Sequence, residues 1–226
     1  MKAIILAAGK GTRFLPVTLT VPKSLIKVGG VPIIERIFSS LPEDIDEVII
    51  VVDHLKDKIE EYIGGNFYGK KVTYTLQGDK KGTFGALLSA KDLLINGERF
   101  LVLNGDDLHD KDELVKCTKY PRSMSVQKKI APRYYSTKID NDGNFLEFKS
   151  QTEEEKINGA LIATGTYVLD TNIFKHEGIH LSGDEYGLPQ TVSTQKDEYP
   201  IKVVETNGWI SINTPEELEK AQKHLN

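Results

Sequence analysis

The chain has 226 residues, of which 39% are hydrophobic and 27% are charged, and its formal net charge at pH 7 is −4. This composition is typical of a globular protein with a substantial core, and its weak negative charge argues against a basic nucleic-acid-binding surface. No segment approaches the ~20 consecutive apolar residues of a membrane span. The single cysteine, Cys117, excludes an intramolecular disulfide and a cysteine-based zinc cluster. We therefore expect a cytoplasmic protein that binds neither nucleic acid nor membrane.

Apolar and amphipathic segments alternate through the first half of the chain. The pattern predicts strands at residues 2–8, 47–52, 72–76 and 99–103, and helices at residues 33–41, 55–63 and 83–94. Strands that alternate with helices are typical of βαβ units with a parallel sheet. Because the strands are apolar without interruption, we expect helices to cover both faces of that sheet.

The pattern changes after Leu108. Shorter strands are predicted at residues 123–128, 135–139 and 145–148, and a long apolar run follows at residues 157–169. A helix is predicted at residues 215–225, with Asn213 or Thr214 as its N-cap. No repeat or linker divides the chain, so we expect one domain over residues 1–226. Its class is α/β, with a mixed, mostly parallel sheet flanked by helices and a small β-rich subregion.

A glycine-containing loop follows the first predicted strand, in the stretch LAAGKGTRFLPVT. Gly9 and Gly11 allow the backbone to approach a ligand closely, and successive N–H groups in such a turn bind anions. Arg13 and, just past the loop, Lys23 add positive charge suited to a polyphosphate. The stretch is neither a Walker A motif nor a complete dinucleotide fingerprint, because Phe14 occupies the third glycine position. The competing interpretation is a plain surface turn.

The pattern G-x-G-T-R-x-x-P, followed by P-K, resembles the signature of the sugar-1-phosphate nucleotidylyltransferases. These enzymes join a nucleoside triphosphate to a sugar 1-phosphate and release pyrophosphate. The resemblance implies a Rossmann-like fold of the nucleotide-diphospho-sugar transferase type. Residues 1–108 would form the nucleotide-binding half, and residues 109–226 the sugar-binding half and the closing helix. It places the nucleotide contacts of the loop on Leu6, Ala8, Gly9, Gly11, Thr12, Arg13 and Lys23.

Two acidic residues, Asp106 and Asp107, follow the predicted strand at residues 99–103. Ligands of open α/β sheets bind at the carboxyl ends of strands, and Mg²⁺ prefers carboxylate and phosphate oxygens. The resemblance implies that Asp106 holds Mg²⁺. Asp107 is the candidate for a contact to the sugar phosphate, and it could instead face solvent, cap the next segment or contact nucleotide hydroxyls. A simple turn at the strand end is the alternative.

The second metal ligand of the family comes from a W-x-D-x-x-T-P motif near the C-terminus. This chain carries the segment WISINTP, in which Ser211 replaces the aspartate. A related branch, the N-acetylglucosamine-1-phosphate uridylyltransferases, uses an asparagine in a V-N-x motif, and Ile212-Asn213-Thr214 resembles that arrangement. The resemblance therefore implies Asn213 as the second ligand, while capping of the last helix by Asn213 has equal weight.

Gln77, which follows the third predicted strand, is the candidate residue for recognition of the nucleotide base. A glutamine amide offers one acceptor and two donors, which match the N–H and C=O edge of uracil or thymine. In uridylyl- and thymidylyltransferases such a glutamine is followed five residues later by glycine, and Gly82 reproduces that spacing. Thr83 is expected to start the next helix. The signal favours UTP or dTTP over GTP and does not separate the first two.

On the sugar side, Glu147-Phe148-Lys149 resembles the E-x-K segment of the family, and Thr164-Gly165 resembles its N/T-G-x-Y element. The resemblance implies that Glu147 accepts hydrogen bonds from sugar hydroxyls and that Lys149 contacts the sugar phosphate. A surface ion pair between these two residues is the alternative. Ala163 stands where N-acetylglucosamine enzymes carry an asparagine, which argues against an N-acetyl sugar. Three aromatic residues are expected to pack against other side chains rather than to stack on a ligand: Tyr134, Tyr135 and Trp209.

The predicted reaction is in-line attack of a glucose 1-phosphate-like substrate on the α-phosphate of UTP or dTTP, with Mg²⁺ and with Arg13, Lys23 and Asp106 as catalytic residues. Two other interpretations remain open. One is a CTP-dependent cytidylyltransferase of an alcohol phosphate such as phosphocholine. The other is a non-catalytic sensor of a nucleotide-sugar, which the Ser211 replacement keeps open. The sequence also leaves a homo-oligomer open.

Overall fold

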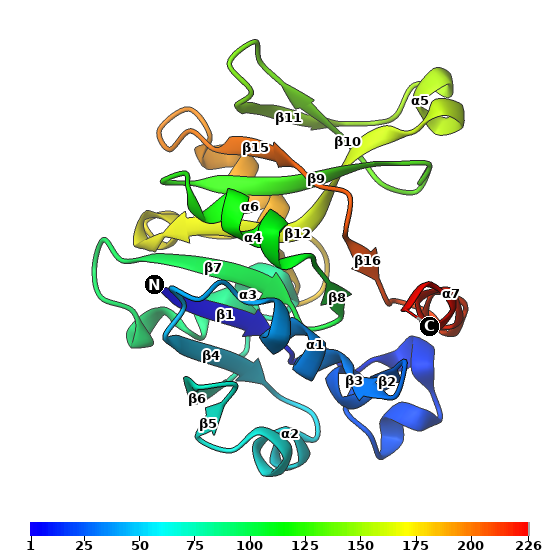
Figure 1. The fold of residues 1–226 in the computed structure, drawn as a ribbon. Coiled ribbons are helices and arrows are strands. Elements are labelled where there is room, and N and C mark those ends of the chain that lie inside the picture. Colours follow the sequence, from blue (N-terminus) through cyan, green and yellow to red (C-terminus); the bar gives the residue numbers. More distant parts are fainter. Residues whose placement is uncertain (226) are drawn as a thin grey trace.

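An eight-stranded sheet runs through the middle of the protein (Figure 1). The structure, a computed structural model, describes residues 1–225. The order of strands across the sheet is β15-β9-β12-β7-β1-β4-β6-β5. In chain order these strands are β1 (Lys2–Leu6), β4 (Glu47–Val52), β5 (Asn66–Phe67), β6 (Lys70–Leu76), β7 (Arg99–Asn104), β9 (Ser123–Lys129), β12 (Ala160–Asp170) and β15 (Lys202–Glu205).

Most neighbouring strands of this sheet are parallel. β1 pairs in parallel with both β4 and β7, and β4 pairs in parallel with β6. β12 lies antiparallel between β7 and β9, and the short β5 is antiparallel to β6. The expected mixed, mostly parallel sheet is therefore confirmed.

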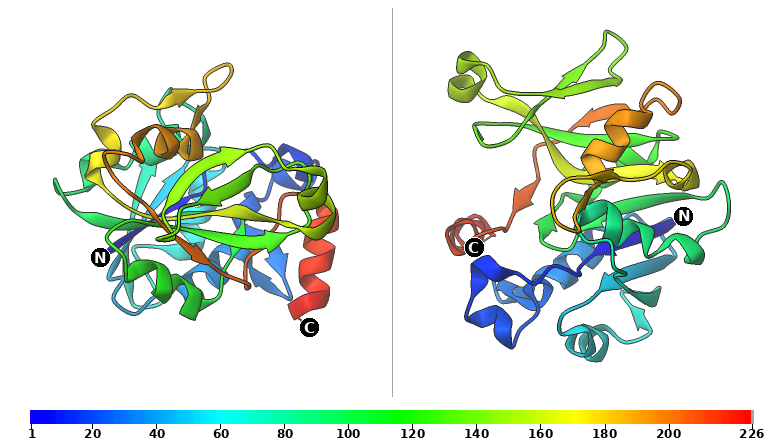
Figure 2. Two further views of the ribbon diagram at one scale, coloured as in Figure 1. Left: turned by 90° about the horizontal axis from the view of Figure 1, so that it is seen from above. Right: turned by 180° about the vertical axis from the view of Figure 1, so that it is seen from behind.

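Helices cover both faces of the sheet (Figure 2). The helices are α1 (Ile33–Ser40), α2 (Lys56–Ile63), α3 (Gly82–Leu88), α4 (Lys111–Thr118), α5 (Glu153–Asn158), α6 (Leu188–Gln195) and α7 (Pro215–Leu225). Successive side chains of a strand point to opposite faces. Ile5 therefore packs in the core formed with α1, α2 and α4, whereas Ile4 packs in the core formed with α3 and α6. This double burial explains the uninterrupted apolar strands of the sequence.

Four two-stranded sheets complete the fold. They are β2 (Lys27–Val28) with β3 (Val31–Pro32), β8 (Asp107–Leu108) with β16 (Ile210–Ser211), β10 (Ser136–Ile139) with β11 (Phe145–Lys149), and β13 (Ile179–His180) with β14 (Tyr186–Gly187). The β10–β11 hairpin projects beyond β9 and β15 (Figure 1). It is the expected β-rich subregion, although the first of the three strands expected there, β9, joins the central sheet instead.

Some local predictions differ from the structure. The helix expected at residues 83–94 ends at Leu88, because the Ala90 N–H donates to the Leu87 carbonyl, three residues back, and the α-helical hydrogen-bond pattern stops there. A separate 3₁₀ turn covers Lys91–Leu93. Helices α4, α5 and α6 and strand β15 were not predicted. Short helices without a long apolar stripe give a weak periodic signal.

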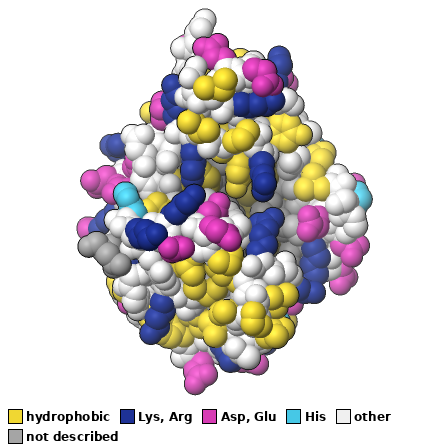
Figure 3. All heavy atoms as spheres, turned by 90° about the vertical axis from the view of Figure 1, so that its right-hand side faces the viewer, with side chains coloured by type: hydrophobic (Ala, Val, Ile, Leu, Met, Phe, Trp, Pro, Cys, Tyr) yellow, Lys and Arg dark blue, Asp and Glu magenta, His cyan; other side chains and the backbone are white. Residues whose placement is uncertain are grey.

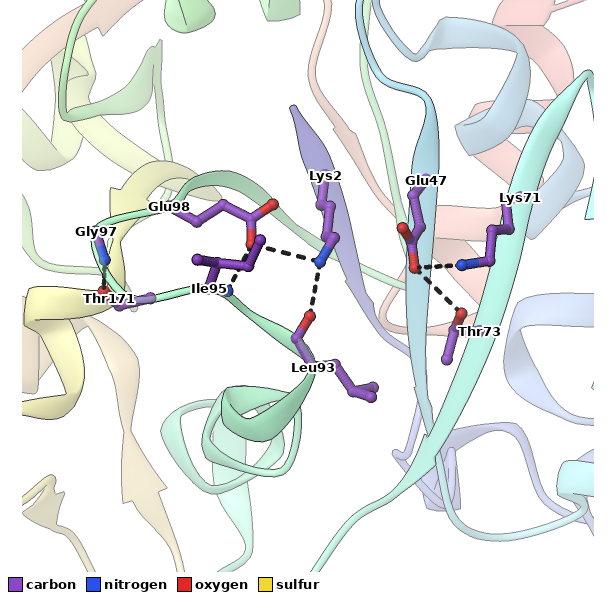
Figure 4. Close-up of polar contacts among 9 residues, drawn as sticks. All are labelled: Lys2, Glu47, Lys71, Thr73, Leu93, Ile95, Gly97, Glu98 and Thr171. Carbon is purple, nitrogen blue, oxygen red and sulfur yellow. Dashed lines mark hydrogen bonds and ion pairs between the residues drawn. The ribbon is translucent and has the colours of Figure 1, made fainter.

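Polar contacts close the amino-terminal edge of the sheet (Figure 4). The Lys2 ammonium donates to the Leu93 carbonyl at 2.7 Å and lies 3.4 Å from Glu98. Glu47 accepts from Lys71 at 3.4 Å on the next strands. These contacts fix the amino-terminal ends of the strands. A ligand site is therefore expected at the opposite edge, where the strands end.

Candidate active site

A cleft of about 1400 Å³ opens at the carboxyl edge of the sheet. It runs from the loop after β1 and the ends of β6 and β7 to the middle of β12 and the β13–β14 hairpin. Figure 3 shows a face of the molecule that is hollowed near its centre, with Lys and Arg side chains around the hollow. Many residues predicted for substrate or metal binding line the cleft, namely Leu6, Ala8, Gly9, Gly11, Thr12, Gln77, Gly82, Thr83, Asp106, Asp107, Thr164, Gly165 and Asn213.

The loop after β1 has a defined shape. Gly11 adopts φ +62°, and a Cβ at this position would lie 2.9 Å from Thr18 and 3.2 Å from the Lys23 side chain. The Thr18 hydroxyl donates to the Gly11 carbonyl at 2.9 Å, and His54 binds the Thr18 carbonyl at 3.1 Å. In contrast, the Cβ direction of Gly9 is open. Hydrogen bonds to Thr18 and His54 therefore hold one side of the loop, and no side chain of residues 1–225 covers the backbone at Gly9. An anion-binding turn requires backbone N–H groups that are accessible in this way.

Arg13 lies in the 3₁₀ turn Thr12–Phe14 of this loop. It is exposed and does not line the cleft. Its predicted contact with the triphosphate would therefore need the side chain to swing inward, and it stays a prediction.

Asp106 and Asn213 line one corner of the cleft, and Lys23, which is not among the lining residues, contacts both of them from behind the corner. The Lys23 ammonium forms an ion pair with the Asp106 carboxylate and lies 3.4 Å from the Asn213 side-chain oxygen. Gly105 makes this possible, because its N–H donates to the Leu6 carbonyl at 2.9 Å and a Cβ there would come equally close to that oxygen. The end of β7 thus lies tightly against the end of β1.

The N-terminal cap of α7 decides between the two interpretations of Asn213. The Thr214 hydroxyl accepts from the Glu217 N–H at 3.2 Å, and the Glu217 carboxylate accepts from the Asn213 N–H at 2.6 Å. Thr214 therefore caps the helix in this structure. The Ile212 N–H donates to the Asp106 carbonyl at 3.1 Å, which holds the Asn213 side chain beside Asp106.

Ser211 does not enter this corner. It pairs with Asp107 in the β8–β16 ladder, is buried, and does not line the cleft. Of the two candidate positions near the C-terminus, only Asn213 directs an oxygen toward Lys23 and Asp106.

Asp107 is buried beneath the corner. It accepts from the Asn104 side-chain amide at 2.9 Å. Burial first, and then the charge of Asp106, raise the pKa of the Asp107 carboxyl well above its ordinary value. Gly165 adopts φ +80°, and any side chain there would collide with Asn104. The geometry therefore gives Asp107 a part in holding Asn104 and the strand ends together, beside its predicted contact with the sugar phosphate.

The Gln77 amide orients the predicted base site. Its Nε2 donates to the carbonyls of Lys80 and Gly82, both at 3.2 Å. Oε1 is therefore the side-chain atom left to accept from a ligand. Gly82 adopts φ +76° and a Cβ there would lie 2.6 Å from the Tyr186 carbonyl, so the β13–β14 hairpin packs directly on this turn. The Thr83 hydroxyl, in the first turn of α3, accepts from the Leu188 N–H at 2.9 Å.

The predicted sugar-side residues are divided by the structure. Glu147 and Lys149 form an exposed ion pair at 3.7 Å, and neither lines the cleft. Phe148, between them on β11, points the other way and does line it. Thr164 is buried at the bulge of β12, where its hydroxyl meets the Ser125 hydroxyl of β9. A sugar contact by Glu147 or Lys149 therefore stays a prediction that needs movement of the hairpin.

Two aromatic residues of the cleft were expected to pack, and the structure exposes them. Tyr134 and Tyr135 are 43% and 60% exposed and line the cleft. Gln151 holds their loop by donating to the Tyr134 carbonyl at 2.7 Å. Burial and then the charges of Glu217 and Asp107 raise the pKa of the Tyr134 phenol. Trp209, in contrast, is buried as expected.

Other cleft residues gave no motif in the sequence. Lys81 forms an ion pair with Asp53 at 3.0 Å, and both line the cleft. The tip of the β13–β14 hairpin is attached to them, because the Lys81 N–H donates to the Asp184 carbonyl at 2.7 Å. Residues that meet across 28 or more positions of the sequence form no short motif, so the sequence alone could not reveal these contacts.

Within residues 1–225, no group of three or more histidine, cysteine, aspartate or glutamate side chains is placed to hold a metal ion. Asp106 and Asn213 nevertheless share one cation, the Lys23 ammonium. A carboxylate and an amide oxygen suit Mg²⁺, which keeps waters and takes substrate phosphates as its other ligands. The donor set therefore fits this ion. None of the described helices is long and apolar enough to cross a membrane.

Comparison with known proteins identifies the family of this chain. A family model described as nucleotidyl transferase matches residues 2–225, and the chain belongs to this family. The bifunctional protein GlmU of Methanocaldococcus jannaschii is 32% identical over 229 residues, which cover the whole chain and 54% of that relative. The chain thus spans about half the length of such curated relatives. The UTP–glucose-1-phosphate uridylyltransferase AglF of Haloferax volcanii is 28% identical over the whole chain and 96% of its own length.

Solved structures share the fold. A UDP-glucose pyrophosphorylase complexed with UDP-glucose superimposes with a TM-score of 0.83 at 22% identity, over 99% of this chain and 97% of that one. A putative glucose-1-phosphate thymidylyltransferase from Bacillus anthracis gives a TM-score of 0.80 at 24% identity, over 99% and 94% of the two chains. The expected nucleotide-diphospho-sugar transferase fold is therefore confirmed.

Proposed function

We propose that the protein transfers the nucleotidyl group of UTP or dTTP to a sugar 1-phosphate, with release of pyrophosphate. The observation that carries this proposal is the meeting of Lys23, Asp106 and Asn213 beside the loop after β1. These residues lie up to 190 positions apart in the chain. Their convergence at the carboxyl edge of the sheet is what a phosphate-transfer site requires.

The loop residues Gly9 to Thr12 would hold the β- and γ-phosphates through backbone N–H groups. In this proposal the Lys23 ammonium would neutralise charge at the α-phosphate, and its pairing with Asp106 and its packing against Gly11 of the loop support that role. Positioning and charge stabilisation supply most of the catalysis in phosphate transfer, so no covalent nucleophile is needed. When bound to Asp106 and Asn213, Mg²⁺ would supply further neutralisation of the phosphate oxygens.

The base preference rests on Gln77. Its amide nitrogen is engaged by two backbone carbonyls, and its oxygen accepts. Uracil and thymine carry a donor at N3, whereas cytosine carries an acceptor there. A contact between Oε1 and the base at N3 would therefore favour UTP and dTTP over CTP, and this supports the sugar nucleotidylyltransferase over the cytidylyltransferase.

The acceptor would lie in the half of the cleft formed by Tyr134, Tyr135, Phe148 and the β12 bulge. Exposed aromatic rings suit the apolar face of a pyranose. Ala163 lines the cleft at the position where N-acetylglucosamine enzymes carry an asparagine, which supports a glucose-like sugar. In this proposal residues 1–108 bind the nucleotide and residues 109–226 bind the acceptor and close the site.

The test is a matrix of UTP, dTTP, CTP, GTP and ATP against glucose 1-phosphate, N-acetylglucosamine 1-phosphate and phosphocholine, with Mg²⁺, scored by pyrophosphate release. We expect turnover with UTP or dTTP and glucose 1-phosphate. Turnover confined to CTP and phosphocholine would support the cytidylyltransferase instead. Tight nucleotide-sugar binding without turnover in any pair would support the sensor.

A further inference from the structure

The metal ligands of the cleft are held by a lysine of the same chain. The Lys23 ammonium is paired with the Asp106 carboxylate and lies 3.4 Å from the Asn213 oxygen. Its side chain is only 13% exposed, and that of Asp106 is 27% exposed. A cation so placed contacts Asp106 Oδ2 and Asn213 Oδ1, one side-chain oxygen of each predicted Mg²⁺ ligand.

The backbone on both sides holds this arrangement. Lys23 begins a 3₁₀ turn directly after Pro22, and its Cβ lies against Gly11 of the loop. The Asn213 N–H donates to the Glu217 carboxylate, and the Glu217 N–H donates to the Thr214 hydroxyl at the start of α7. The three groups therefore come together through packing of separate elements.

Charge makes the two cations exclusive. An ammonium and a divalent ion on the same carboxylate repel each other strongly at such short range. A single carboxylate and a neutral amide also form a weak site for Mg²⁺ without further anionic oxygens. A triphosphate bound to the loop brings those oxygens, and it also offers Lys23 a different anionic partner.

We propose that Lys23 guards the metal ligands, so that Asp106 and Asn213 become available to a divalent cation only when a nucleoside triphosphate draws the ammonium away. This inference rests on the proposed function, since it assigns a second role to the same site. It makes binding of nucleotide and metal mutually dependent. It also keeps the free protein from holding the metal in an unproductive position.

The test measures Mn²⁺ alone, by electron paramagnetic resonance titration of the full chain without nucleotide. Lys23→Met removes the charge and keeps most of the side-chain length. We expect it to tighten Mn²⁺ binding by at least about tenfold relative to wild type. The double variant Lys23→Met/Asp106→Asn should lose this gain, because it lacks the carboxylate. Lys23→Arg keeps the charge and should show no gain.

Lys81→Met is the matched control, because Lys81 also forms an ion pair in the cleft, but with Asp53 at 3.0 Å. It should leave Mn²⁺ binding at the wild-type level. Circular dichroism checks that each variant is folded. If Lys23→Met does not fold, Lys23→Gln is used as the neutral variant instead. Equal Mn²⁺ affinity in wild type and the neutral variant would overturn the inference. A gain that survives Asp106→Asn would do the same.

This readout is separate from the test of function. Wild-type turnover in the nucleotide and sugar matrix with no gain of Mn²⁺ binding in Lys23→Met would leave the proposed function standing and reject the guard role. A gain of Mn²⁺ binding in Lys23→Met, in a protein without turnover, would reject the proposed function and leave the guard role of Lys23 standing.

Discussion

At the scale of single residues, the cleft depends on side chains that serve two structural contacts at once. Lys23 joins Asp106 to Asn213, and the amide of Gln77 joins two carbonyls of its own turn. The Gln77 amide is thereby oriented before a substrate arrives, which lowers the reorganisation needed during reaction. Substitutions here should change catalysis far more than stability.

We expect Asp106→Ala and Lys23→Ala each to lower kcat by at least about 100-fold, the scale seen when a group that stabilises a transition state is removed. Steady-state pyrophosphate release with UTP and glucose 1-phosphate measures the effect. Asp112→Ala, an exposed acidic change in the first turn of α4, is the control and should retain wild-type kcat. Near-wild-type turnover in either cleft variant would remove that residue from the catalytic set.

We expect Gln77→Glu to lower the ratio of kcat/KM for UTP to kcat/KM for CTP by at least about tenfold. A carboxylate cannot donate to the carbonyls of Lys80 and Gly82, so the turn loses both hydrogen bonds and the orientation of the remaining oxygen. Competition between the two nucleotides in one assay measures the ratio directly. An unchanged ratio would show that Gln77 does not read the base.

At the scale of elements, the base site depends on the packing of the β13–β14 hairpin on the turn before α3. The Lys81 N–H donates to Asp184, and the Tyr186 N–H donates back to Lys81 at 2.8 Å. The close approach is possible because Gly82 has no side chain. The hairpin therefore packs on the base site and is hydrogen-bonded to it, although about 100 residues separate the two in the chain.

We expect Gly82→Ala to lower the free energy of unfolding by about 2 kcal/mol and to raise KM for UTP. The new Cβ would lie 2.6 Å from the Tyr186 carbonyl at a backbone φ of +76°. Urea unfolding and UTP kinetics measure the two effects. Gly78→Ala is the matched control, since its Cβ meets only the Ser89 hydroxyl at 3.9 Å and its φ is not positive. Similar stability of the two variants would contradict the close packing.

At the scale of the whole molecule, burial of polar groups under the sheet edge links stability to pH. His109 is partly buried, and burial lowers its pKa from 6.5 to about 4. Its ring contacts only the Thr166 hydroxyl, at 3.1 Å, among the hydrogen-bond partners of residues 1–225. The unfolded chain binds a proton at this position before the folded chain does, so stability falls as pH drops from about 6.5 toward 4.

We expect the difference in unfolding free energy between wild type and His109→Asn to shift by about 2 kcal/mol between pH 7.5 and pH 5, with the wild type losing more. Urea unfolding at the two pH values gives the difference. His176→Asn is the control, because this exposed histidine forms only a surface pair with Glu198 at 3.1 Å. A pH-independent difference for His109→Asn would show that the ring titrates normally in the folded protein.

Much of the fold was predictable because it depends on local patterns. Burial on both faces leaves continuous apolar strands, and the predicted strands and helices of residues 2–104 match β1, α1, β4, α2, β6 and β7 closely. The second half was harder. The run at residues 157–169 is divided: Ile157 and Asn158 end α5, Gly159 follows the helix, and the rest lies in the long strand β12, where Gly165 lies at a bulge.

The sequence by itself determined the loop after β1, the acidic pair after β7 and the family to which the chain belongs, because glycine spacing and charge at strand ends act locally. Only the tertiary structure decided which distant residues share the cleft. It brought Asn213 to Lys23 and Asp106, gave the helix cap to Thr214, turned Phe148 toward the cleft and left Glu147 and Lys149 on the surface. The physical reason is that proximity across the chain follows from strand order and packing, which no short stretch of sequence records.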